Sequence, residues 1–207
     1  MGIKEQNIQY IRRLPLFVIL DEADESNNDH LGTEIKRGLL SYFNQDPFLL
    51  ERLYISFSIL TKDGLYEINS YKELFESSCN IEDKSIIANN LSDAFSCLIN
   101  KYVNKTTAFT KGDWIPTFVI FNINKNTSYT IQSPNKLRII SVSNHVLTID
   151  SKYETWHFRM VYTASNINNI AKCISNIISP HALAIGQSGY EWIDEFNSKD
   201  FQISQIR

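Results

Sequence analysis

Glycine and cysteine are both scarce in this sequence, and their placement argues against two common kinds of site. None of the seven glycines lies in a Gly-x-x-x-x-Gly-Lys pattern, which P-loop nucleotide hydrolases need because its backbone N–H groups surround the phosphates. The three cysteines, Cys79, Cys97 and Cys173, are far apart in the chain. We therefore expect neither a P-loop nor a Cys-x-x-Cys zinc site, and no disulfide framework.

The sequence also has no excess of basic residues and no long apolar run. The formal net charge is −3, with 20 Lys and Arg against 23 Asp and Glu, whereas binding to nucleic acid depends on Lys and Arg that neutralise phosphates. No apolar run reaches the roughly 18 residues that cross a bilayer, and residues 1–13 lack the apolar core of a signal peptide. We expect a cytoplasmic protein without a nucleic-acid or membrane partner.

Buried strands and amphipathic helices alternate along the chain. Continuous apolar runs and one Asp-Gly hairpin signal predict strands at residues 14–21, 53–60, 65–68, 116–123, 136–142 and 158–163. Apolar residues at helical spacing predict helices at residues 31–43, 88–103 and 167–178. This alternation predicts an α/β fold with a mostly parallel sheet, an antiparallel edge strand and helices on both faces.

Short motifs in a fixed order resemble one family. They are Arg12-Arg13-Leu14-Pro15, Asp46-Pro47 with Leu50-Glu51, Tyr54-Ile55-Ser56, and Lys111-Gly112-Asp113-Trp114 with Pro116. In order and spacing they resemble the TerY-like von Willebrand factor A (vWA) domains of bacterial tellurite-resistance and stress operons. The resemblance implies a three-layer, Rossmann-type vWA-like fold.

The same resemblance predicts how the chain is divided. We expect a single vWA-like domain over residues 1–179, with an inserted hairpin at about 144–158, where a typical family member runs straight from strand to strand. Residues 180–207 form a C-terminal tail rich in aromatic and charged residues, including Tyr190 and Trp192. The tail either folds back onto the domain or serves as a partner-binding arm, since Trp and Tyr are frequent interface anchors.

Members of this family usually hold a divalent cation in a metal-ion-dependent adhesion site at the carboxyl ends of the strands. Their first loop is Asp-x-Ser-x-Ser, and a Thr and an Asp come from two further loops; Mg²⁺ takes about six such oxygens. Here Asp21 is retained, but Ala23 and Glu25 stand at the two serine positions. The Thr position falls near Asn89, and the third-loop Asp position falls at 122–124, where no acid remains. The adhesion site is therefore degenerate.

Two non-catalytic interpretations of this loop remain open. In the favoured one no metal is bound, and Asp21 accepts hydrogen bonds from backbone N–H groups while the neighbouring acids are solvated. In the other, carboxylate and amide oxygens form an altered cation site, which suits Ca²⁺ better than Mg²⁺ because Ca²⁺ accepts irregular oxygen cages. The residues of that altered site are Asp21, Asp24, Glu25, Asn89, Asn122 and Asn124.

Catalysis is a third interpretation. Asp21-Glu22-Ala23-Asp24 after a buried strand is typical of the Mg²⁺-binding motif of DEAD-box helicases, but those enzymes carry a P-loop upstream, and only twenty residues precede Asp21. Ser188, in Gly186-Gln187-Ser188-Gly189-Tyr190, lacks the Gly-x-Ser-x-Gly frame of a nucleophile elbow. We therefore predict no catalytic residue, with an ATPase or a hydrolase kept only as an alternative.

The sequence thus favours a non-catalytic adaptor of bacterial stress or defence that binds another protein. By the family resemblance, its partners would be kinase-like or phosphatase-like products of the same operon. Docking is predicted at the strand-end loops or at the tail; the residues concerned are Glu22, Asp24, Glu25 and Asp29 in the loops and Tyr190 and Trp192 in the tail. The main alternative is a binding module that depends on Ca²⁺ or Mg²⁺ with altered ligands.

Overall fold

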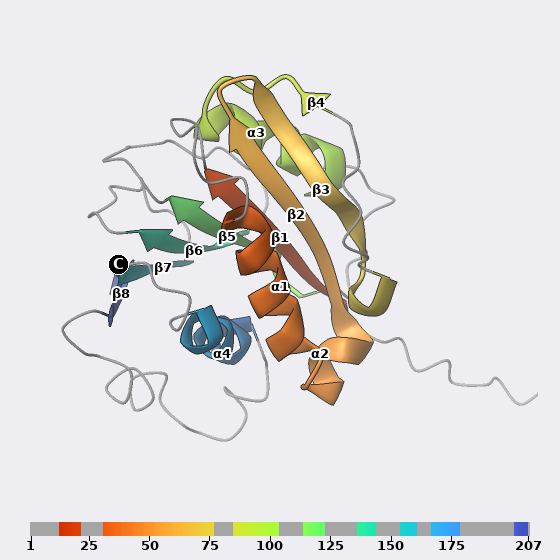
Figure 1. The fold of residues 1–207 in the computed structure, drawn as a ribbon, viewed down its shortest axis with the longest axis vertical. Coiled ribbons are helices and arrows are strands. Elements are labelled where there is room, and N and C mark those ends of the chain that lie inside the picture. The colour runs from red at the N-terminus through yellow and green to blue at the C-terminus, as the bar shows by residue number, and fades with distance from the viewer. Residues whose placement is uncertain are drawn as a thin grey trace, which may run out of the picture.

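The computed structural model describes residues 13–21, 31–76, 85–103, 114–122, 136–143, 154–160, 167–178 and 201–206. Within these ranges one sheet has eight strands in the order β4-β3-β2-β1-β5-β6-β7-β8 (Figure 1). The strands are β1 Leu14–Asp21, β2 Leu53–Thr61, β3 Gly64–Glu73, β4 Ser85–Ile86, β5 Thr117–Asn122, β6 Arg138–Ser143, β7 Glu154–Met160 and β8 Phe201–Ile206. The α-helices are α1 Leu31–Phe43, α2 Pro47–Arg52, α3 Leu91–Leu98 and α4 Ile167–Ile178, with a 3₁₀ turn η1 Leu74–Glu76 and a π-helix η2 Ile99–Val103.

Five neighbouring strands, β2-β1-β5-β6-β7, run parallel to one another. The strands outside them pair antiparallel: β3 with β2, β4 with β3, and β8 with β7. The prediction of an α/β fold with a mostly parallel sheet is confirmed. In the part of the chain that the structure describes, no helix has the length and apolar character to cross a membrane.

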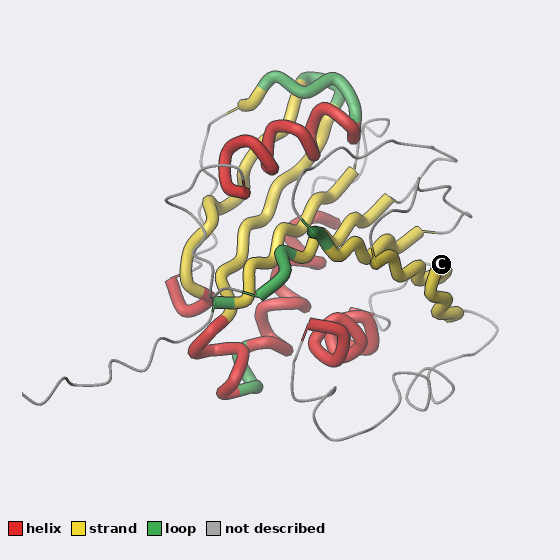
Figure 2. Tube along the Cα trace, turned by 180° about the vertical axis from the view of Figure 1, so that it is seen from behind, coloured by secondary structure: helices red, strands yellow, loops and turns green. Residues whose placement is uncertain are grey.

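Helices cover both faces of the sheet. Along β1, Leu16, Val18 and Leu20 pack on the side of α1 and α4, whereas Phe17 and Ile19 pack on the side of α3. Figure 1 is seen from the α1 and α4 side, and Figure 2, from behind, shows α3 lying across the other face. We call the latter the α3 face. Because β1 is buried on both faces, its apolar run is continuous rather than alternating.

Local chemistry explains where several elements begin and meet. The Asp46 carboxylate accepts hydrogen bonds from the N–H groups of Phe48 and Leu49, at 2.9 and 3.4 Å, and so caps the start of α2. Gly64, with a φ of 138°, closes the turn between β2 and β3. A Cβ at Gly38 of α1 would lie 2.2 Å from Cγ2 of Ile167 in α4, so the two helices approach this closely only because Gly38 has no side chain.

Two sequence predictions about the C-terminal third need correction. Residues 154–158, assigned to the end of an inserted hairpin, belong to β7, which pairs in parallel with β6; residues 144–153 lie outside the described ranges. The predicted domain boundary at 179 leaves out a strand, because β8 pairs with β7 along the edge of the same sheet. This part of the tail folds back onto the domain.

Candidate functional site

The order of the strands points to one edge of the sheet. β2 lies on one side of β1 and β5 on the other, so the direction of chain progression reverses between β1 and β5. In open α/β sheets, ligands bind outside the carboxyl ends of the strands at such a switch point. Asp21 ends β1, Asn122 ends β5, and the two are register partners.

A row of register partners runs along this carboxyl edge: Leu60 of β2, Asp21, Asn122 and Ser143 of β6. Side chains alternate along a strand, so Asp21 lies on the α3 face with Ile19. The side chains of Asn122 and Ser143 are buried, each at 1% exposure, and Asp21 is partly exposed. The α3 face, apolar at its centre, is therefore polar at the switch point. We call Asp21, Asn122 and Ser143 the edge row.

Asn122 binds directly to Asp21. Its Nδ2 donates a hydrogen bond to Oδ2 of Asp21 over 3.2 Å. The carboxamide therefore turns its N–H group, not its oxygen, toward the carboxylate, and a hydrogen bond to a charged acceptor stabilises that charge without a metal. A cation at this carboxylate oxygen would meet a donor where the resembled family supplies an acid. The described residues do not fit the Mg²⁺ site of that family.

Asn89, the third described member of the predicted cation site, lies at the start of α3. Its backbone N–H donates to Oδ2 of Asp93 over 3.1 Å, and Asn90 Oδ1 accepts from the Asp93 N–H over 2.9 Å. This reciprocal arrangement caps α3. Asn89 is exposed. Among the described residues, no three His, Cys, Asp or Glu side chains are grouped as a metal site would require.

The other predicted site residues are outside the described ranges. They are Glu22, Asp24, Glu25 and Asp29 of the first loop, Asn124 of the third loop, and Tyr190 and Trp192 of the tail. Of the predicted set, the structure brings together Asp21 and Asn122.

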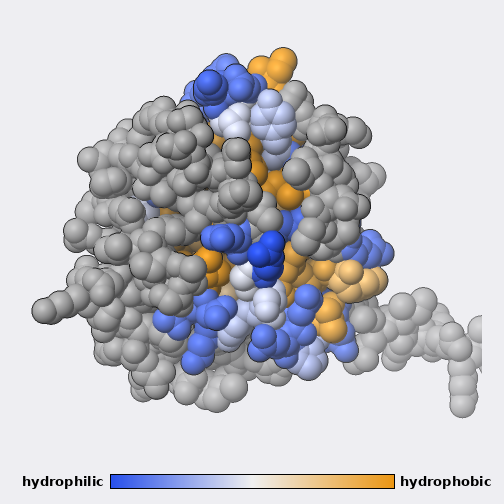
Figure 3. All heavy atoms as spheres, viewed as in Figure 1, coloured by the Kyte–Doolittle hydropathy of each residue, from blue (hydrophilic) through white to orange (hydrophobic). Residues whose placement is uncertain are grey.

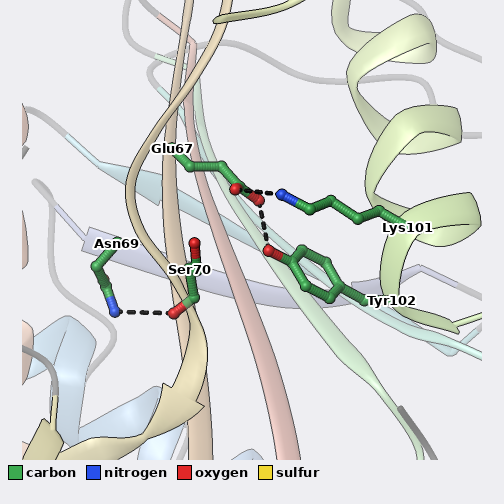
Figure 4. Close-up of polar contacts among 5 residues, drawn as sticks. All are labelled: Glu67, Asn69, Ser70, Lys101 and Tyr102. Atoms are coloured by element: carbon green, nitrogen blue, oxygen red, sulfur yellow. Dashed lines mark hydrogen bonds and ion pairs between the residues drawn. The ribbon is translucent and has the colours of Figure 1, made fainter. Parts of the chain in front are cut away.

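A second polar cluster was not foreseen from the sequence. Glu67 of β3 is 1% exposed, and its carboxylate accepts hydrogen bonds from Lys101 Nζ at 2.5 Å and from the Tyr102 hydroxyl at 2.8 Å (Figure 4). Both donors come from η2. A π-helical turn is rare and is frequently found at functional sites. Here it directs the side chains of two consecutive residues at one carboxylate. We call these three residues the Glu67 network.

Burial and hydrogen bonding set the charges of the Glu67 network. Burial lowers the pKa of Lys101, but the hydrogen bonds to Glu67 and Tyr102 outweigh it, so the pKa ends above its ordinary value. Burial and the bond to Glu67 raise the pKa of Tyr102. At neutral pH Lys101 is therefore a cation and Tyr102 a neutral donor. The ammonium group of Lys101 pairs with the carboxylate of Glu67 inside the network. This internal pairing suits a structural role.

An aromatic cluster packs against the Tyr102 ring of the network. The ring of Phe17 on β1 stacks on Tyr71, Tyr102 and Phe118, with centroids 5.4, 5.6 and 4.9 Å away. Tyr102 thus contacts the core with its ring and Glu67 with its hydroxyl. The end of α3 is held to the sheet by both kinds of contact.

Apolar side chains reach the surface over α2 and η1 (Figure 3). Leu50 of α2 is 37% exposed and Phe75 of η1 is 66% exposed. Single exposed apolar residues are common on protein surfaces, so Leu50 and Phe75 do not indicate a binding site.

No protein-family model matches the chain, and no curated protein matches it either. Among solved structures, the chain is similar to two crystal structures of proximal thread matrix protein 1 from the mussel byssus, with identities of 7% and 8% and TM-scores of 0.45 and 0.47. Each alignment covers 80% of this chain but only 48% or 47% of the mussel chain, so this chain spans about half its length. A likeness at this level carries no argument about function.

Proposed function

We propose that the protein is a non-catalytic, metal-independent protein-binding module: a vWA-like adaptor, similar to the TerY-like domains, in bacterial stress or defence. The observation that carries the proposal is the hydrogen bond from Asn122 to Asp21 at the switch point. This edge of the sheet is where a ligand is expected to bind, and the retained carboxylate there accepts a hydrogen bond from a neutral amide and keeps its negative charge.

The strand order supports the vWA-like part of the proposal. Without the two-residue β4, the order of the first six strands is 3-2-1-4-5-6 in the sequence of the chain, which is a Rossmann-type order. An antiparallel strand lies beyond β2, as in the fold that the sequence resembles. The strand β8 is an addition to that layout.

The proposed partner follows from charge. A metal-bearing domain offers a cation to a partner's carboxylate, whereas here Asp21 ends β1 at this edge and the acids Glu22, Asp24, Glu25 and Asp29 follow it in the sequence. We expect the partner to present Lys or Arg there, and the family resemblance directs the search to kinase-like or phosphatase-like proteins. The module would act in the cytoplasm.

Replacing Asn122 with Asp tests the loss of the metal site. It places a second carboxylate beside Asp21 at a position that is 1% exposed, and like charges at hydrogen-bonding distance repel each other. We expect a lower melting temperature in EDTA and recovery in millimolar Mg²⁺ or Ca²⁺, because a ligand of the folded state adds RT ln(1 + [L]/Kd), about 2.7 kcal/mol at a hundredfold excess over Kd. Scanning calorimetry of the parent and of the Asn122→Asp variant, each in EDTA and in the cation, measures the change in melting temperature.

The matched control is Asp21→Asn in the Asn122→Asp background, which removes the pair of carboxylates and should abolish the response to the cation. The parent chain should show no cation-dependent shift. If the parent instead melts several degrees higher in Mg²⁺ or Ca²⁺, and Asp21→Asn removes that gain, the protein is the metal-dependent module. That alternative has one observation in its favour, namely that Asp21 and Asn122 lie side by side.

A capture experiment tests the adaptor role directly. The immobilised full chain should retain the same partner in EDTA and in Mg²⁺, and reversal of Glu22, Asp24 and Glu25 to Lys should slow association most at low salt, since screening weakens such steering. Lys62→Glu, in the turn between β2 and β3, is the surface control. Measurable nucleotide hydrolysis by the purified chain would favour the enzyme alternative.

A further inference from the structure

Three irregularities of the backbone and core meet around Glu67. The register of β3 against β2 shifts twice, between Ile55 and Phe57 and between Phe57 and Ser58. The helix α3 is continued by the π-helical η2, and η2 supplies the two side chains that bind Glu67. Asn69, on the bulged part of β3, donates from Nδ2 to the backbone carbonyl of Ser70 over 3.2 Å (Figure 4). Bulges of this kind re-aim side chains and interrupt the ladder of backbone hydrogen bonds.

The third irregularity is a pair of buried hydroxyls. Ser56 and Ser58 of β2 are 1% and 0% exposed, and neither Oγ has a hydrogen-bond partner among the residues that the structure describes. Both lie on the α3 face, because they alternate with Phe57, which packs on the other side. A buried hydroxyl without a partner is costly, and buried waters in native proteins typically bond to such otherwise unsatisfied groups.

Glu67 supplies the acceptor that such a water needs. It is the register partner of Ser58 on the neighbouring strand, and cross-strand partners have Cβ atoms roughly 4.5–5.5 Å apart. Each oxygen of the Glu67 carboxylate accepts one hydrogen bond of the network: Oε2 from Lys101 and Oε1 from Tyr102. An ionised carboxylate accepts about four hydrogen bonds, so the carboxylate has capacity for further donors.

We propose that Ser56, Ser58 and Glu67 form an internal water-binding site between β2, the bulged β3 and η2. Ordered water there accepts from or donates to the serine hydroxyls and donates to the Glu67 carboxylate. The register shifts between β2 and β3 and the π-helical turn η2 then have a common role, which is to accommodate this water on the α3 face. Water fits this chemistry because it is small and both donates and accepts.

A crystal structure of the full chain tests the site directly. Ordered density is expected within about 3.2 Å of Ser58 Oγ and of a Glu67 carboxylate oxygen. A direct bond between Ser58 and Glu67, or density for neither arrangement, would overturn the proposal.

A double-mutant cycle in solution gives an independent measurement. Ser58→Ala should lower the urea midpoint, because the water loses a partner, and the effect should shrink in a Glu67→Gln background, because bridged groups are coupled. Ser96→Ala is the control, since Ser96 is exposed and its hydroxyl donates to the carbonyl of Ser92; it should show no coupling to Glu67→Gln. A dry site predicts the opposite sign: removal of an unpaired buried hydroxyl would raise the midpoint, and this result would reject the water site.

Discussion

Replacement of Ile19 with Asp is expected to unfold the domain. Ile19 is 0% exposed in a strand that has a parallel neighbour on each side, Ser58 on β2 and Ile120 on β5. A buried charge without a partner costs several kcal/mol, against a total stability of about 5–15 kcal/mol for a domain. Circular dichroism at 25 °C should show loss of the helical signal.

Two controls make this result specific to the core. Ile19→Val removes one methylene group and should cost about 0.5–1.5 kcal/mol while the fold persists. Ile115→Asp introduces the same charge at a site that is 42% exposed, so its effect should stay within about 0.5 kcal/mol. If Ile19→Asp melts near the parent temperature, β1 is not the central strand.

The second large effect is expected in the Glu67 network. Lys101→Met leaves the carboxylate of Glu67 buried without its cation, and breaking a buried pair from one side costs about 3–5 kcal/mol. Lys101 itself is 36% exposed, so solvent screens part of its interaction and the loss should lie at or below the lower end of that range. Urea unfolding monitored by tryptophan fluorescence measures the change.

The double variant Glu67→Leu, Lys101→Met should recover part of the lost stability, because it leaves no buried charge without a partner. The recovery stays incomplete, because the Tyr102 hydroxyl loses its acceptor. Lys62→Met, in the exposed turn, is the control for the loss of a surface lysine. An equal effect of Lys101→Met and Lys62→Met would show that the bond between Lys101 and Glu67 contributes nothing to stability.

Periodicity predicted the elements that are buried on one or both faces. The strand β1, the hairpin of β2 and β3 and the helix α1 all follow from apolar spacing and from Asp63-Gly64. The strand β7 was predicted too late in the chain, because its first residues, Glu154 and Thr155, interrupt the apolar run. The strand β8 carries an alternating signal in Phe201-Gln202-Ile203-Ser204, which would have identified it.

The polar contacts were harder to predict, because they join residues that are distant in the sequence. Resemblance placed Asp21 and Asn122 in one site, yet only the structure shows that the amide donates to the carboxylate. Lys101 and Tyr102 lie 34 and 35 residues from Glu67. A single Glu in a strand and a Lys-Tyr pair at the end of a helix carry no periodic signal that connects them.

The central position of β1 has a consequence for synthesis of the chain. Asp21 and Asn122, which end the paired strands β1 and β5, are 101 residues apart, so one side of β1 has no native neighbour until β5 has been made. Ribosomes add about 5–20 residues per second, which leaves that edge open on the order of five to twenty seconds. An apolar strand with an open edge is prone to pair with other chains. Nascent chains halted before residue 117 should therefore depend on chaperones far more than the finished protein.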